Sequence, residues 1–443
     1  MKVLASIWFA CFSVLVSLAQ PAKVEVVKNE IGWQLLVNDK PYYVKGAGGH
    51  VQQKKLVEIG GNTIRTWSTD NAKTILDEAH RNGLMVMMGL WVQHERHGFD
   101  YDDPVKVKAQ LEGFRSAVLE LKDHPALLLW GVGNEVDLFY KNTNVWYAVE
   151  DIAKMIHELD PNHPTCTVTA GFDPMEARLI MERAPSIDIY GVNTYGDIGN
   201  VKDAIRACGW NKSYMITEWG PNGHWEVAKT TWNAPIEQSS HEKADSYESR
   251  YLQFIEADKE MCLGSFVFLW GQKQETTSTW YGLFSESGET SEAIDRLHQI
   301  WKGSPPKNSA PSLQPSLLNN ARRGESIKIE AGDKCTATIV ASDVNGDDVK
   351  IKVFVVPEST DIKSGGDAEN APPAVSGLSM RMRNQVAHFY APSAPGNYRL
   401  FIFVYDKKGA YAYENIPFEV IKPVSGTRTK RPVAFKPMDM SFQ

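Results

Sequence analysis

The sequence predicts an α/β protein, a (β/α)8 TIM barrel followed by a C-terminal immunoglobulin-like β-sandwich. Three observations lead to this prediction. Eight short apolar runs alternate with amphipathic stretches over the first two thirds of the chain, as the strands and helices of a parallel barrel do. At Gly303-Ser304-Pro305-Pro306 the composition changes, and short β-branched runs separated by turns follow. The length of 443 residues accommodates a barrel of about 250 residues and a smaller second domain.

The N-terminal segment has the pattern of an export signal. Lys2 supplies a positive charge, and residues 3–18 are nearly all apolar. Small residues stand at Ser17 and Ala19, as a signal peptidase requires. The sequence therefore predicts a signal peptide over residues 1–19. Export to the periplasm, the cell surface or the medium would leave a mature chain with no membrane span.

The barrel is expected over residues 20–302, beginning with a hairpin at 24–45. The apolar runs expected to form its strands are 43–47, 62–66, 84–91, 127–132, 165–169, 187–193, 214–218 and 265–270. Start and stop signals predict helices at 70–82, from Asp103-Pro104 to 122, at 148–159 and at 239–261. A doubly wound open sheet is the alternative, but no glycine-rich phosphate loop follows the first strand.

The second domain is expected at 312–422, after a linker at 303–311 and before a tail at 423–443. Its predicted strands are 326–330, 336–341, 350–355, 385–390, 398–405 and 411–420. The stretch from Asp343 to Asp348 has part of a calcium-loop pattern but lacks the final bidentate glutamate, so a hairpin turn at Asn345-Gly346 is favoured.

The sequence predicts no metal and no cofactor. The histidines near the ends of the first and third strands have no carboxylate or cysteine partner that would complete a metal site; they are His50, His94 and His97. The cysteines after the signal are widely spaced and are expected to be buried free thiols; they are Cys166, Cys208, Cys262 and Cys335.

Two strands each lead directly to a carboxylate. The fourth apolar run ends in Asn134-Glu135, and the seventh ends in Thr217-Glu218. Reactive groups of a barrel stand at the carboxyl ends of its strands, so both side chains are expected at one rim. Glycosidic cleavage uses such a pair, which in the retaining mechanism lies about 5 Å apart. Glu135 is the expected acid/base and Glu218 the expected nucleophile of a retaining glycoside hydrolase.

Here the chain resembles the family 2 β-glycosidases and their wider clan. Asp123-His124-Pro125 through Glu135 resembles their acid/base signature, Gly60 to Arg65 their second barrel strand, and Thr217 to Gly220 their nucleophile strand. The resemblance implies that Arg65 positions the nucleophile. It also implies that Trp270, after the eighth strand, is a sugar platform. Without the two domains that precede the barrel in family 2, the architecture looks more like the family 158 endo-β-1,3-glucanases.

Further substrate-binding residues are expected around this pair. Asn134 would bond the sugar 2-hydroxyl, and Tyr195, after Asn193, would donate to Glu218, although Tyr195 as a packed aromatic is an alternative. Aromatic residues are dense in the expected rim loops and suit a polysaccharide cleft. These residues are Trp91, Phe99, Tyr101, Phe139, Tyr140, Trp146, Trp225, Trp232, Trp280 and Tyr281. Trp91, His94, Asn193 and Trp225 are taken as substrate contacts.

The expected partner is a polysaccharide or oligosaccharide. A formal net charge of −7 argues against nucleic acid, because phosphate binding needs a basic face. The leading expectation is an exported, endo-acting β-1,3-glucan hydrolase that works by double displacement. The alternatives are a β-galactosidase-like or β-mannanase-like hydrolase, a β-glucan transglycosylase on the same site, and a non-catalytic carbohydrate-binding protein.

Overall fold

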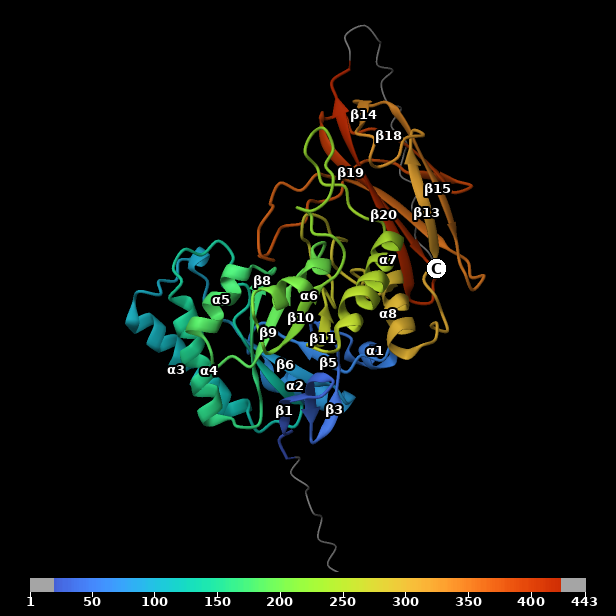
Figure 1. The fold of residues 1–443 in the computed structure, drawn as a ribbon. Helices are drawn as coiled ribbons and strands as arrows, with labels where there is room; N and C mark the ends of the chain where they lie inside the picture. Colours follow the sequence, from blue (N-terminus) through green and yellow to red (C-terminus); the bar gives the residue numbers. More distant parts are fainter. Residues whose placement is uncertain (1–19, 424–443) are drawn as a thin grey trace, which may run out of the picture.

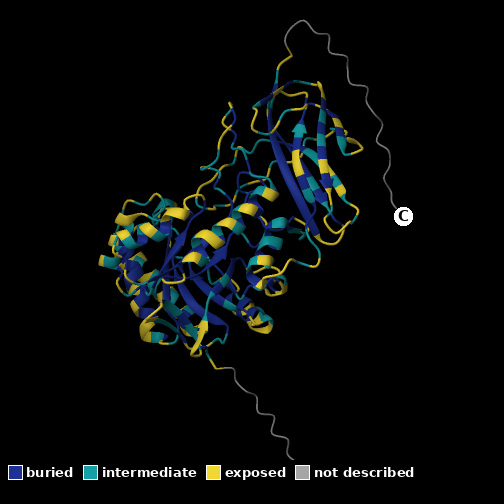
Figure 2. Cartoon of the chain, turned by 45° about the vertical axis from the view of Figure 1, so that its right-hand side comes forward, coloured by how far each residue is buried: buried dark blue, intermediate teal, exposed yellow. Residues whose placement is uncertain are grey.

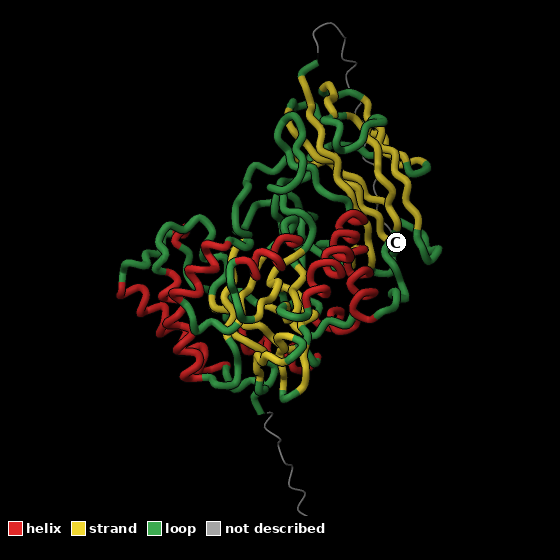
Figure 3. Tube along the Cα trace, in the orientation of Figure 1, coloured by secondary structure: helices red, strands yellow, loops and turns green. Residues whose placement is uncertain are grey.

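The computed structural model describes residues 20–423. The predicted signal peptide and residues 424–443 of the predicted tail therefore lie outside the described residues. The described chain forms two units that lie against each other (Figure 1). The first is a ring of helices around strands and ends with a helix at Lys302, and the second consists of strands and loops (Figure 3).

Eight parallel strands close into a barrel, as predicted, which excludes the open sheet. They follow one another around the barrel in sequence order. Most of their residues are buried, and so these strands have nearly continuous apolar sequences. The strands are β4 (Val44–Gly48), β5 (Thr63–Arg65), β6 (Met85–Leu90), β7 (Leu127–Val132), β8 (Thr165–Ala170), β9 (Ile189–Asn193), β10 (Ser213–Trp219) and β11 (Cys262–Val267).

Helices cover the outside of the barrel, with their exposed residues facing away from it (Figure 2). The Asp103 side chain accepts hydrogen bonds from the amides of Val105 and Lys106 and caps α3. Gly83 ends α2 with a φ of +73°. The helices are α1 (Gln53–Glu58), α2 (Ala72–Asn82), α3 (Pro104–Leu121), α4 (Val145–Leu159), α5 (Pro174–Arg183), α6 (Ile198–Ala207), α7 (Ser240–Arg250) and α8 (Glu292–Lys302).

The single long helix expected over 239–261 is wrong. Helix α7 ends at Arg250, and the chain continues as a π-helical turn over Tyr251–Ile255 and a 3-10 turn over Glu256–Asp258. Tyr251 and Ile255 are both buried. The apolar spacing of this segment therefore reflects packing against the barrel through a wider turn, which α-helical periodicity does not distinguish.

A small antiparallel sheet closes the amino end of the barrel. It consists of β1 (Val24–Asn29), β2 (Gly32–Val37) and β3 (Lys40–Tyr42) and includes the predicted hairpin. Val24 and Leu35 pack in one core cluster with Leu128 and Met215 of the barrel strands. Since this end is filled, substrate access is left to the carboxyl ends of the strands, which we call the mouth of the barrel.

The second unit has two sheets around one core. One holds β14 (Ile327–Glu330), β16 (Lys350–Pro357), β19 (Gly396–Tyr405) and β20 (Ala410–Ile421), and the other holds β13 (Ser312–Leu318), β15 (Lys334–Ser342), β17 (Arg381–Arg383) and β18 (Val386–Tyr390). The short strand β12 (Thr290–Ser291) of the first unit pairs with β20. Strands β15 and β16 belong to different sheets, so the expected hairpin at Asn345-Gly346 is wrong and this turn crosses between sheets. That the sandwich is immunoglobulin-like stays a prediction.

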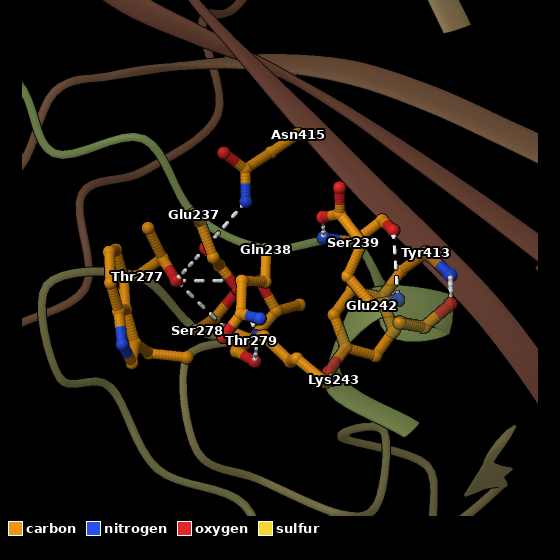
Figure 4. Close-up of polar contacts among 12 residues, drawn as sticks. Glu237, Gln238, Ser239, Glu242, Lys243, Thr277, Ser278, Thr279, Tyr413 and Asn415 are labelled. Carbon is orange, nitrogen blue, oxygen red and sulfur yellow. Dashed lines mark hydrogen bonds and ion pairs between the residues drawn. The ribbon is translucent and has the colours of Figure 1, made fainter. Parts of the chain in front are cut away.

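A buried polar network joins the barrel to the second unit (Figure 4). Glu237, which is almost fully buried, accepts hydrogen bonds from Lys243 at 2.5 Å, Thr277 at 2.6 Å, Thr279 at 2.8 Å and Asn415 at 2.5 Å. Lys243 also donates to the Thr279 carbonyl oxygen at 2.6 Å. The two charges are thus fully surrounded by partners, as buried charges must be.

The four cysteines within residues 20–423 are free thiols, and three of them are buried. No described helix is long and apolar enough to cross a membrane.

Candidate active site

The two carboxylates predicted from the sequence lie at the barrel mouth. Glu218 belongs to the end of β10, and Glu135 follows β7 in a tight turn. Gly133 in that turn has a φ of +80°, and a Cβ there would lie 3.1 Å from the Val136 side chain, so the turn needs a glycine. The Glu135 amide bonds the carbonyl oxygen of Val168 in the next strand at 2.9 Å, which fixes the turn over the mouth.

Three donors hold the Glu218 carboxylate. Arg65, at the end of β5, donates to its Oε1 at 2.9 Å, and the Trp67 indole donates to the same oxygen at 2.8 Å. The Tyr195 hydroxyl donates to Oε2 at 3.1 Å. Arg65 places a positive charge beside the carboxylate, and the three donors together fix the direction in which its oxygens point.

Two asparagines connect the carboxylates. Asn134 Oδ1 accepts from Arg65 at 2.5 Å and from Asn193 at 3.1 Å, which leaves its Nδ2 as the donor for a substrate hydroxyl. Asn193 Nδ2 also donates to Glu135 at 2.8 Å. The Thr217 hydroxyl fixes Asn193 by donating to its Oδ1 at 2.8 Å. The pair therefore stands in one hydrogen-bonded frame built by four barrel strands.

The pKa of Glu135 is raised to about 8, chiefly by burial and then by the nearby charge of Glu218, against a lowering by the Asn193 hydrogen bond. The carboxyl is therefore protonated at neutral pH and able to donate a proton to a leaving oxygen. This contrast with the ion-paired Glu218 is the division of roles that a retaining glycosidase requires.

The pH dependence of activity follows from this pKa. A general acid works in its protonated form, so kcat/KM is expected to fall as pH rises through about 8 and then by about tenfold per pH unit. Initial rates on an aryl glycoside between pH 5 and pH 10 check this. Glu135→Gln is expected to remove the alkaline limb. If the variant kept the alkaline limb, the loss of activity at high pH would be due to the titration of another group.

Three other residues predicted to bind substrate differ from one another in how far they are exposed at the mouth. Trp225 is exposed in the loop after β10 and packs edge-on against Tyr195, with ring centroids 5.8 Å apart. Trp91 is half-buried after β6 and packs against His94. His94 itself is buried beneath the site, where its Nε2 bonds the Asn134 carbonyl oxygen at 2.6 Å. It supports the turn and is not presented to substrate.

The expectation of a sugar platform at Trp270 is not met. Trp270 is 1% exposed, its indole donates to the Val51 carbonyl oxygen at 2.8 Å, and its ring packs against Phe284. Its indole N–H and ring face are thus used within the protein core. The aromatic side chains that contact Glu218 are instead Trp67 and Tyr195, and the rings of Phe268 and Tyr281 pack on Tyr195.

Trp67 is the functional residue that sequence reasoning missed. It lies two residues after Arg65, at the end of a barrel strand, and this position could have indicated that it lies at the mouth. Glu275 was missed as well, because it lies in the long loop after β11, far from any strand end. It is buried, its pKa is raised by burial, and the charge of Glu218 acts on it.

Comparison with known proteins gives the following relatives. The family model described as glycosyl hydrolases family 2, TIM barrel domain, matches residues 55–221. The β-glucuronidase of Felis catus is 27% identical over 269 residues, which are 53% of this chain and 39% of that protein. The Canis lupus familiaris β-glucuronidase is 26% identical over 310 residues, 61% of this chain and 45% of that one. The chain thus spans less than half the length of these curated relatives.

Solved structures show the same fold. Lactobacillus rhamnosus β-glucuronidase has a TM-score of 0.51 at 19% identity, over 64% of this chain and 53% of that chain. A calcium-binding mutant of Bacteroides uniformis β-glucuronidase 2 has a TM-score of 0.51 at 14% identity, over 90% of this chain and 48% of that chain.

These relatives overturn the expected endo-acting β-1,3-glucanase, because they are β-glucuronidases. The structure gives a physical reason for the error. Several of the aromatic residues taken as rim platforms are buried and serve packing, namely Tyr101, Trp146, Trp280 and Tyr281. The likeness to family 158 stays a prediction. The matches support a clan-A glycoside hydrolase, with the family 2 model covering residues 55–221 of its barrel.

Proposed function

We propose that this protein is a retaining β-glycosidase, with Glu218 as nucleophile and Glu135 as acid/base. The observation that carries the proposal is the contrast between the two carboxyls. Glu218 is bonded by Arg65, Trp67 and Tyr195, while burial keeps Glu135 protonated at neutral pH. Two carboxyls with such different environments are what double displacement needs.

The reaction would proceed in two steps. In the first, Glu218 attacks the anomeric carbon while Glu135 gives its proton to the departing oxygen, which leaves as an alcohol. In the second, Glu135, now a carboxylate, takes a proton from water, and the water oxygen displaces Glu218 from the sugar. The product keeps the β configuration. Asn134 would bond the sugar 2-hydroxyl through its free Nδ2 in both steps.

β-Glucuronides are the first candidate substrates, since the curated relatives are β-glucuronidases. One observation favours a neutral sugar as the second candidate. Three cations around the mouth already have carboxylate partners: Arg65 pairs with Glu218, Arg96 with Asp367 and Lys273 with Glu275. A uronate carboxylate that bound one of these three cations would compete with its present partner, whereas a β-galactoside or β-mannoside would not.

A panel of methylumbelliferyl β-glycosides tests the proposal. The glucuronide, galactoside, glucoside and mannoside are each incubated with the wild type and with Glu218→Gln, and the released fluorophore is measured. Release from one of them, lost in the variant, supports the mechanism and identifies the sugar. Transfer to an added sugar acceptor, seen by sizing the products, would indicate a transglycosylase. Glycan binding without release from any glycoside would favour a carbohydrate-binding protein. Export remains part of the proposal and is tested by fractionating the producing cells.

A further inference from the structure

A loop of the second unit extends to the barrel mouth. Residues 358–380, between β16 and β17, contain no helix or strand, and none of them is buried. This segment, which we call the mouth loop, is seen in orange where it descends from the second unit toward the barrel (Figure 1). A loop without a core of its own is held in place by the contacts that it makes.

Hydrogen bonds between residues 361–363 and 369–370 give the mouth loop a defined shape. The Asn370 amide and side chain both donate to Asp361, at 2.9 and 2.8 Å, and the Lys363 amide donates to Glu369 at 2.9 Å. Between them the chain reverses at Gly365 and Gly366, with φ values of +64° and +71°. Glycine adopts left-handed conformations at the lowest cost of any residue. The tip of the loop is therefore the turn Ser364-Gly365-Gly366-Asp367.

The tip is bound on one side to the loop that follows β6. Asp367 accepts two hydrogen bonds from the Arg96 guanidinium, at 2.8 and 3.2 Å, and lies 3.1 Å from His97 Nε2. Arg96 also donates to the Ser364 carbonyl oxygen at 3.3 Å. A bidentate contact of this kind fixes both the position and the orientation of the Asp367 carboxylate.

The other side of the tip is bound to the loop that follows β11. Lys273 donates to the Gly366 carbonyl oxygen at 3.0 Å, and the Thr276 amide donates to Glu369 at 2.6 Å. This loop also carries Glu275, on which the charges of both Glu218 and Glu369 act. The mouth loop thus reaches the surroundings of the nucleophile.

The tip therefore bridges two separate parts of the mouth. Four residues span at most about 14 Å, yet they join loops from the third and the eighth strand of the barrel. A Cβ at Gly365 would lie 2.6 Å from the Leu138 side chain, in the loop after the fourth strand. The backbone of the tip is packed on that loop as well.

We propose that the mouth loop determines specificity by closing one side of the active site, so that the enzyme takes the end of a glycan chain and not its interior. This rests on the glycosidase activity proposed above. Arg96, His97, Lys273 and Thr276 act by positioning the loop, and Asp367 is its main anchor.

The test uses two variants of the full chain. One deletes residues 362–369 and joins Asp361 to Asn370, which already touch. The other is Asp367→Ala. Asp348→Ala is the matched control, since Asp348 is 93% exposed and pairs with Lys407 within the second unit.

Hydrogen exchange measures the bridge without reference to activity. Faster exchange of the backbone at residues 95–97 and 273–277 is expected in both variants and not in the control. Unchanged exchange at either segment in the deletion variant would show that the bridge does not hold these loops, and the proposal would be abandoned.

Product sizing measures the effect of the mouth loop on where the enzyme cleaves a glycan chain. The substrates are the aryl glycoside identified by the panel and a β-linked oligosaccharide series of the same sugar. The wild type is expected to release monosaccharide only. The deletion is expected to raise internal cleavage at least about tenfold, while kcat/KM on the aryl glycoside changes by less than about threefold.

The outcomes separate the two proposals. Internal fragments from the wild type, or identical products from the wild type and the deletion variant, would overturn the role of the loop. If no glycoside in the panel is cleaved, the proposed function fails, and the exchange result still decides whether the bridge exists.

Discussion

Glu218→Gln is expected to lower kcat/KM on the preferred aryl glycoside by at least about 10⁴-fold, the largest effect of any single change in this protein. The variant keeps the size of the side chain and its acceptor oxygen, so Arg65, Trp67 and Tyr195 keep a partner. It removes the charge that attacks the anomeric carbon. Fluorophore release under single-turnover conditions measures the loss.

Glu135→Gln is the informative comparison. Without a general acid, cleavage depends on how easily the aglycone leaves, so the loss should be much smaller for a dinitrophenyl glycoside than for a methylumbelliferyl one. For Glu218→Gln the loss should be the same for both. Glu112→Gln, on the exposed face of α3, controls for the substitution itself. Wild-type rates in Glu218→Gln would show that Glu218 is not the nucleophile.

Breaking the buried Glu237–Lys243 pair, which lies in the barrel unit at its contact with the second unit, is expected to have the largest effect on stability. Lys243→Met leaves Glu237 buried with only neutral donors, and Glu237→Gln leaves the Lys243 ammonium without its hydrogen-bonded counter-charge. Each change is expected to lower the free energy of unfolding by about 3–5 kcal/mol. The reason is that an unpaired charge cannot recover its hydration inside the interface. Denaturant unfolding followed by tryptophan fluorescence measures it.

The double variant separates the cost of an unpaired buried charge from the cost of lost packing. With both charges gone, Glu237→Gln with Lys243→Met should be less destabilised than the sum of the single changes. Lys55→Met is the surface control. It breaks the pair with Glu58, which is 2.7 Å long against 2.5 Å for the buried pair but has 39% and 63% of the two side chains exposed, and should cost less than about 1 kcal/mol. Single variants as stable as this control would show that solvent reaches the pair.

The fold and the two carboxyls could be predicted from local sequence. A barrel strand buried on both sides must be a short apolar run, and a parallel barrel must alternate such runs with amphipathic helices. The position of a carboxylate directly after a run then determines its place at the mouth. Glu135 and Glu218 were found in this way, and Arg65 lies at the end of its own strand.

The rest depended on long-range packing. Trp270 and His94 follow strands as Trp67 does, yet the first two are buried and only Trp67 reaches Glu218. An aromatic side chain serves packing or substrate binding according to what lies opposite to it, and the sequence does not contain that information. The preference for a long cleft came from counting such residues, and for that reason the expected substrate was wrong.

The sequence by itself thus determined the barrel, the position of two carboxyls at its mouth and the presence of a second β-rich unit, because each follows from residue periodicity and strand ends. Only the tertiary structure decided what surrounds the carboxyls. The turn Ser364-Gly365-Gly366-Asp367 is a weak pattern in the sequence, and it lies about 230 residues from Glu135, the proposed acid/base. Its contacts with Arg96 and Lys273 arise because the second unit packs against the barrel through the Glu237–Lys243 network, an arrangement that no local pattern encodes.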